Sequence, residues 1–168
     1  PAYILFPQCP PGDLWAYFET SREPGRTVEI SFPFHKKPTD VSLTLMKLVD
    51  SLKRSDKIDI SRIYIGGLSQ GGMGVLDLIA TYPRVFAGAF SICGAGNVST
   101  ATKFAGKTAL WLFHGDADDV ITVSFSRNYY KKLQKLKSDV VYSEYPGVKH
   151  NSWVNAFAEP ALMYWLFS

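Results

Sequence analysis

The segment that most constrains this fold is a glycine-rich box over residues 66–72, which reads Gly-Gly-Leu-Ser-Gln-Gly-Gly. It directly follows the apolar residues 63–65 and precedes a stretch with helical spacing. A Gly-x-Ser-x-Gly box in this place predicts a sharp strand-to-helix turn that holds its serine in a strained conformation. We expect Gly67 and Gly71 to leave room for the tight backbone approach, so that the Ser69 hydroxyl projects above a sheet.

Composition predicts one domain. The chain has 168 residues, of which 46% are hydrophobic, and this is enough for a sizeable core within a single domain over residues 1–168.

The formal charge is +3 and the basic residues are scattered, so we expect no nucleic-acid partner. No apolar run approaches the ~18 residues of a membrane span. Cys9 and Cys93 lack metal-ligand spacing and are interpreted as free thiols, with a disulfide as the alternative. We therefore expect no metal and no cofactor.

Apolar runs alternate with amphipathic segments along the chain. We expect strands over residues 3–6, 27–32, 62–66, 85–93, 109–113 and 140–145. We expect helices over residues 39–55, 70–82, 124–137 and 153–167, the last of them interrupted at Pro160. The apolar stripe of the first helix is predicted at Val41, Leu45, Leu48 and Leu52. This alternation predicts an α/β fold: a mostly parallel central sheet with helices on both faces and its ligand site beyond the carboxyl ends of the strands.

The acidic candidates lie just past the strand expected over residues 109–113. A serine hydroxyl becomes a useful nucleophile only when a base takes its proton and a carboxylate orients that base. Asp116, Asp118 and Asp119 fall within residues 114–120, which read His-Gly-Asp-Ala-Asp-Asp-Val. Three close aspartates would also suit a cation, but the oxygen-ligand spacing of a calcium loop is absent. For Asp116 and Asp119 we favour turn-forming or helix-capping roles.

Three histidines are candidates for the base. His35 precedes the serine and has the wrong order, while His114 sits beside the acidic cluster, where we expect it to shape the turn. His150 follows the strand expected over residues 140–145 through a Pro-Gly-Val-Lys loop and precedes a helix. A lone loop histidine is usually a surface residue. Serine, aspartate and histidine in this order, each past a strand, favour His150 as the base.

Residues 67–71, 114–120 and 150–153 together resemble the α/β-hydrolase superfamily. More narrowly, the chain resembles the bacterial esterase group often labelled predicted peptidase, which is related to polyhydroxybutyrate-depolymerase, feruloyl and acetylxylan esterases. Residues 7–10 with Trp15, residues 82–86 and the tail from residue 153 extend this resemblance over nearly the whole chain.

The resemblance implies a role for each site residue. Ser69 matches the nucleophile, Asp118 matches the acid of a His-Gly-x-x-Asp pattern, and His150 matches the base. The backbone amide of Gln70 matches one donor to the oxyanion. The family's second donor comes from a His-Gly-Gly or His-Gly-x-Gly loop after an earlier strand, which does not precede residue 3. We therefore expect that an N-terminal segment of several tens of residues is missing from the sequence, or that another chain supplies it.

These residues predict a serine hydrolase that cleaves carboxylic esters through an acyl-enzyme. The alternatives are a serine peptidase, a thioesterase or phospholipase of the same fold, and a non-catalytic binding member. We expect a small-molecule or polysaccharide-linked ester as substrate, with Trp15 and Trp153 lining its pocket. The resemblance fits a secreted or periplasmic protein, and the sequence leaves the compartment and the oligomeric state open.

Overall fold

The computed structural model describes residues 2–21, 29–34 and 37–167. Thr27, Val28 and His35, which carried expectations above, lie outside the described residues. The elements in chain order are β1 (Glu19–Ser21), β2 (Glu29–Ser31), α1 (Asp40–Leu52), β3 (Tyr64–Leu68), α2 (Gln70–Thr81), β4 (Gly88–Ile92), η1 (Val98–Thr100), α3 (Ala101–Phe104), β5 (Ala109–Gly115), α4 (Ser124–Lys135), β6 (Val140–Tyr145), α5 (Trp153–Phe157) and α6 (Ala161–Phe167).

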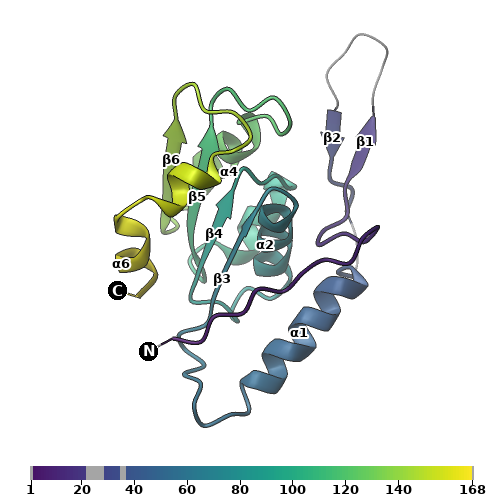
Figure 1. Cartoon of the computed structure of the whole chain (residues 1–168), viewed down its shortest axis with the longest axis vertical. Coiled ribbons are helices and arrows are strands. Elements are labelled where there is room, and N and C mark those ends of the chain that lie inside the picture. Colours follow the sequence, from purple (N-terminus) through teal and green to yellow (C-terminus); the bar gives the residue numbers. More distant parts are fainter. Residues whose placement is uncertain (1, 22–28, 35–36, 168) are drawn as a thin grey trace.

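The centre of the molecule is a four-stranded parallel sheet in the order β3-β4-β5-β6 (Figure 1). The pairing places Leu68 beside Ile92 and Ile92 beside Phe113, so neighbouring strands end at nearly the same level. The carboxyl ends of parallel strands meet at one edge of a sheet. The loops that leave this edge after β3, β5 and β6 carry Ser69, Asp118 and His150.

Helices cover both faces of the sheet, as the sequence predicted. On one face α1, α2, α3 and α4 pack on β4 and β5 around Ile79, Phe104 and Leu110, which are fully buried. On the other face α5 and α6 pack on Trp111 and Phe113 of β5. The predicted break at Pro160 is confirmed, because it separates α5 from α6. This is the α/β arrangement of a parallel sheet with helices on both faces.

The helix α1 begins where the sequence predicted, because the Thr39 hydroxyl accepts a hydrogen bond from the Ser42 amide at 3.2 Å and caps it. The predicted apolar stripe is right in part, because Leu45 packs against the core and Val41 and Leu52 are half-buried. Ser42 and Met46 are buried on this helix, whereas Leu48 is 44% exposed. Ser42 belongs to the inner face because its hydroxyl donates to the Trp15 carbonyl at 2.7 Å. A polar residue with a fixed partner therefore replaces an apolar one in the stripe.

The long segment before α1 folds partly as a two-stranded antiparallel ribbon of β1 and β2, which projects from the body of the molecule (Figure 1). The sequence predicted β2 and missed β1. The three residues of β1 are all exposed, and their composition is polar, so no hydrophobic alternation marks them. Ile30 of β2 and the flanking Phe18 and Phe32 pack against a buried cluster that includes Met73 of α2.

The prediction of a buried strand over residues 3–6 is wrong. Tyr3, Ile4, Leu5 and Phe6 form no strand and are all exposed, Phe6 by 83%. A buried strand needs neighbours for its backbone amides and carbonyls. Among the described residues β3 is an edge strand of the sheet, and its pairing partner is β4.

Candidate active site

Ser69 stands at the turn between β3 and α2 with a φ of 52° and a ψ of −120°. This backbone is strained for a residue with a side chain, and Gln70, the predicted oxyanion donor, follows it as the first residue of α2. The Ser69 amide donates to the Ile92 carbonyl at 2.9 Å and joins the turn to β4. A Cβ on Gly67 would lie 2.4 Å from the Gly71 carbonyl, so the turn closes only over a glycine there. A Cβ on Gly71 would meet no atom within 4 Å, and the prediction that Gly71 provides room is wrong.

Two hydrogen bonds connect Ser69, His150 and Asp118. The Ser69 Oγ lies 2.9 Å from His150 Nε2, and His150 Nδ1 lies 2.8 Å from Oδ2 of Asp118. An ionised carboxylate only accepts, so Nδ1 carries the proton and Nε2 accepts from the serine hydroxyl. The structure therefore brings together the three residues that the sequence singled out, in an arrangement that can take the proton from the serine.

The Asp118 carboxylate is fully buried and its oxygens are occupied by donors. Oδ1 accepts from the amides of Val120 at 2.9 Å and Ile121 at 2.8 Å. Oδ2 lies 2.8 Å from His150 Nδ1 and 3.2 Å from His114 Nε2. These donors replace the water that burial removes, and they fix the direction in which the carboxylate faces His150.

His114 also contacts the Asp118 carboxylate, at the oxygen that faces His150. It is fully buried, with Nε2 at 2.9 Å from the Ile121 carbonyl and Nδ1 at 2.8 Å from Ser126 Oγ. A carbonyl only accepts, so Nε2 holds the proton and Nδ1 accepts from the Ser126 hydroxyl. Burial lowers the pKa of His114, which favours this neutral form. The sequence placed His114 beside the acid; its contact with the carboxylate was missed.

Asp116 and Asp119 connect the loop after β5 to the loop that carries His150. Asp116 Oδ1 accepts from the Gly147 amide at 2.6 Å, and Asp119 Oδ2 pairs with Lys149 Nζ at 3.0 Å. The hydrogen bond from Lys149 lowers the pKa of Asp119. The sequence predicted local turn or cap roles for both aspartates. Asp116 does lie in a turn, but the partners of the two side chains lie 31 and 30 residues away, a separation that no local pattern reveals.

The two predicted pocket tryptophans take different places. The Trp153 ring stands edge-on to the His150 ring, with centroids 5.8 Å apart and an interplanar angle of 89°. Trp15 packs on α2, where a Cβ on Gly74 would lie 2.5 Å from Trp15 Cβ, and its carbonyl holds the start of α1 through Ser42. That both tryptophans line a substrate pocket stays a prediction.

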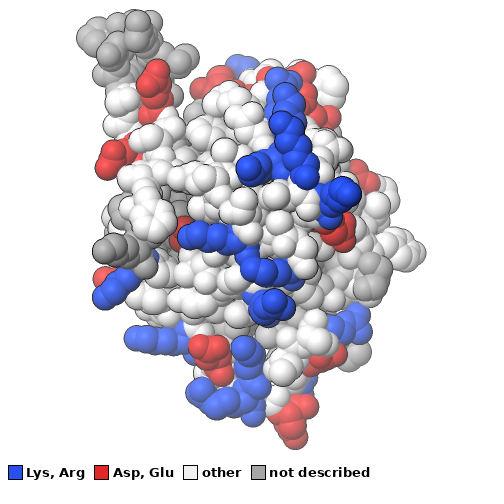
Figure 2. Space-filling model, turned by 180° about the vertical axis from the view of Figure 1, so that it is seen from behind, with Lys and Arg blue, Asp and Glu red and all other residues white. Residues whose placement is uncertain are grey.

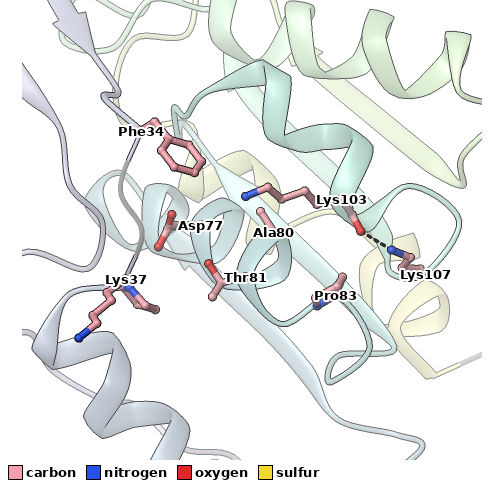
Figure 3. A pocket seen from close by; sticks show the side chains of 9 residues that line it. Phe34, Lys37, Asp77, Ala80, Thr81, Pro83, Lys103 and Lys107 are labelled. Carbon is pink, nitrogen blue, oxygen red and sulfur yellow. Dashed lines mark hydrogen bonds between the residues drawn. The ribbon is translucent and has the colours of Figure 1, made fainter.

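A separate cavity of about 530 Å³ opens beside the C-terminal half of α2 (Figure 3). The Lys103 ammonium lies 5.4 Å from the centroid of the Phe34 ring. The backbone carbonyl of Lys103 accepts a hydrogen bond from Lys107 Nζ at 2.6 Å. The cavity is lined by Phe34, Lys37, Pro38, Asp77, Ala80, Thr81, Pro83, Lys103 and Lys107. Thr81 lies about 17 Å along the helix from its first residue, so this cavity is remote from Ser69.

Basic side chains on the face seen in Figure 2 stand in several separate groups, with Asp and Glu among them. This arrangement agrees with the scattered charge in the sequence.

No helix in the described part of the chain combines the length and the hydropathy needed to cross a membrane.

Comparison with known proteins decides the family. A family model described as Phospholipase/Carboxylesterase matches residues 29–161, a range that includes Ser69, Asp118 and His150. The chain belongs to this family. Its four-stranded parallel sheet with helices on both faces is the corresponding part of the α/β-hydrolase fold.

The relatives of this Phospholipase/Carboxylesterase family chain include a depolymerase and esterases. It is 45% identical over 53 residues (32% of this chain) to a poly(3-hydroxyalkanoate) depolymerase C of Paucimonas lemoignei. It is 31% identical over 87 residues (49% of this chain) to a bifunctional acetylxylan esterase/xylanase of Neocallimastix patriciarum. A crystal structure of a thermostable esterase matches with a TM-score of 0.74 and 35% identity over 77% of this chain. The chain spans 13% of each of these two curated relatives and 37% of the esterase chain.

Proposed function

We propose that this chain is a serine hydrolase that cleaves carboxylic esters, with Ser69 as nucleophile, His150 as base and Asp118 as the residue that orients the base. The hydrogen-bonded chain from Ser69 Oγ through His150 to Asp118 carries this proposal. Membership of the Phospholipase/Carboxylesterase family supports the same reaction type.

In the first half of the reaction, His150 Nε2 takes the hydroxyl proton while Ser69 Oγ attacks the acyl carbon of the ester. The imidazolium that forms is stabilised by Asp118, which already holds Nδ1. The protonated His150 then gives its proton to the alcohol oxygen as the C–O bond breaks. An acyl-enzyme on Ser69 remains, and the alcohol leaves.

In the second half, a water molecule gives its proton to His150 Nε2 and attacks the acyl carbon. Breakdown of this second tetrahedral intermediate returns the proton to Ser69 and releases the carboxylic acid. We assign the backbone amide of Gln70 as one donor to the oxyanion in both halves, because it follows the nucleophile at the start of α2.

The strained φ of Ser69 supports this assignment. Backbone strain of this kind costs roughly 1–3 kcal/mol and persists where the surroundings impose it. Here the Gly67 contact and the bond from the Ser69 amide to Ile92 impose it. The nucleophile is therefore held in place before substrate binds.

The names of the relatives support a substrate class. Two of the curated relatives are named for a poly(3-hydroxyalkanoate) and for acetylxylan, and a third is named an acyl-protein thioesterase. We propose that the substrate is an oxygen ester within or attached to a polymer, or a small ester of the same type.

Replacement of the nucleophile tests the proposal. Ser69→Ala is expected to lower kcat on p-nitrophenyl acetate by about 10⁴- to 10⁶-fold and to leave the far-UV circular dichroism unchanged. A fluorophosphonate probe is expected to label the native chain at Ser69, located by peptide mass spectrometry. The matched control is Ser51→Ala, which removes an exposed serine of α1 and should leave both readouts unchanged.

Two results would contradict the proposal. Near-normal ester hydrolysis by Ser69→Ala would remove Ser69 from the mechanism. A native chain that neither hydrolyses esters nor reacts with the probe would indicate a non-catalytic member. Faster cleavage of p-nitroanilides than of p-nitrophenyl esters would favour the peptidase alternative.

A further inference from the structure

Cys93 occupies a central position under the proposed catalytic residues. It follows β4 directly, between the strands that lead to Ser69 and to Asp118, and it is fully buried. Its φ is 40°, a left-handed value that glycine adopts freely and cysteine does not. Among the described non-glycine residues with positive φ are Ser69 and Cys93, which follow adjacent strands. Strain outside a turn that requires it is a sign of a functional constraint.

The thiol of Cys93 contacts the loop that carries the base. Its Sγ donates to the His150 carbonyl at 3.6 Å. Sγ, an Asp118 carboxylate oxygen and a His150 ring nitrogen all lie within 4.8 Å of one another. The Cys93 amide donates to the Phe113 carbonyl at 2.8 Å, and this bond fixes the thiol relative to β5.

A second buried group lies beside the thiol. The Ser152 hydroxyl is buried and has no hydrogen-bond partner among the described residues. Burial raises the pKa of the Cys93 thiol to about 11. The thiol therefore keeps its proton near neutral pH, where it acts as a donor. A metal ligand or a nucleophile would need the thiolate instead.

We propose that Cys93 is a positioning residue for the base: its S–H bond to the His150 carbonyl holds the loop after β6 so that the imidazole meets both Ser69 and Asp118. The proposal rests on the proposed function of these three residues. It gives the strained backbone a reason, because a φ of 40° at position 93 is what places the side chain under the His150 loop while the amide stays paired with β5. A glycine would relieve the strain and lose the contact.

The test compares substitutions at position 93 by kcat, by KM and by the rate of fluorophosphonate labelling at Ser69. Cys93→Ala removes the donor and is expected to lower kcat and the labelling rate about 10-fold, since small displacements of a catalytic group have large effects. KM should stay within about twofold of the native value. Cys93→Ser keeps an O–H donor and is expected to recover most of the lost rate.

Cys93→Gly covers the case in which Cys93→Ala does not fold. Glycine adopts this φ without strain, so the variant should fold and still show the loss of kcat.

Two controls separate positioning from other effects. Cys9→Ala removes the other cysteine, in the N-terminal segment, and Ile79→Val removes one buried methylene from α2; neither should change kcat.

The outcomes distinguish this inference from the proposed function. If the native chain labels at Ser69 and Cys93→Ala and Cys93→Gly react within twofold of it, the positioning role is wrong while the proposed function stands. A Cys93→Ser variant as slow as Cys93→Ala would overturn the hydrogen bond as the cause. If the native chain itself does not label at Ser69, the proposed function fails and the positioning role fails with it.

Discussion

The two glycines that flank Ser69 at equal distance meet different surroundings. A Cβ at position 67 would lie 2.4 Å from the backbone carbonyl of Gly71, whereas a Cβ at position 71 would meet nothing within 4 Å. We therefore expect Gly67→Ala to force the turn open. Such overpacking costs about 1–3 kcal/mol or more in unfolding free energy, and a shift of Ser69 by about 1 Å can lower kcat about 100-fold.

Gly71→Ala is the matched control for this prediction, with the same chemical change two residues on the other side of the serine. It should leave the free energy of unfolding within about 0.5 kcal/mol of the native value, measured by urea denaturation. Equal destabilisation by both substitutions would show that the contact at position 67 does not shape the turn.

At the scale of residues, the sequence identified the candidate site residues better than it identified the hydrogen-bond and ion-pair partners of their neighbours. Ser69 and His150 could be singled out because each follows a strand in the order that the chemistry needs, and the resemblance to the His-Gly-x-x-Asp pattern selected Asp118 among three aspartates. The contacts of Asp116 with Gly147 and of Asp119 with Lys149 could not, because they depend on how two distant loops meet. The role proposed for Cys93 has no local pattern at all.

At the scale of elements, α4 is tied to β6 by an ionic cluster. Arg127 Nε and Nη2 donate to the two carboxylate oxygens of Glu144 at 2.8 and 2.6 Å, and the Tyr142 hydroxyl donates to the same carboxylate. The hydrogen bonds from Arg127 are the main reason that the pKa of Glu144 falls from 4.5 to about 2. A partly exposed pair of this kind contributes about 0.5–1 kcal/mol.

The lowered pKa of Glu144 predicts how stability depends on pH. The folded value lies below the unfolded value, so the contribution is complete above pH 4.5 and is lost as the pH falls toward about 2. Arg127→Met should therefore reduce the free energy of unfolding at pH 6 and flatten its fall between pH 5 and 2. Lys131→Met, which removes an exposed cation of the same helix, should keep the native slope. Parallel curves for Arg127→Met and the native chain would contradict this prediction.

The helices and strands could be predicted where buried residues recur at a regular spacing along the sequence. β5 and β6 are continuous runs or alternations, and α2 begins at a turn that the glycine box defines. Prediction failed where a polar residue takes an inner position, as Ser42 does in α1, or where an apolar run has no pairing partner, as in residues 3–6. In both cases the deciding contact is made with a segment distant in sequence.

At the scale of the whole molecule, the sheet separates two hydrophobic cores, and we predict that both unfold together as one domain. Three of the four tryptophans, Trp111, Trp153 and Trp165, belong to the core under α5 and α6. Tryptophan fluorescence therefore reports mainly this face, whereas far-UV circular dichroism reports the helices of both faces. If residues 1–168 form one cooperative unit, the two signals should change at the same denaturant concentration.

Leu162→Ala tests this coupling because it acts on one face only. Leu162 of α6 is 4% exposed and packs in the core with Trp111. Its truncation should cost about 2–5 kcal/mol and move both transitions to the same lower urea concentration. Met163→Ala, at the neighbouring position that is 57% exposed, should move neither. If the fluorescence transition moves alone, α5 and α6 unfold separately from the helices on the opposite face, and the two cores are independent units joined only by the strands between them.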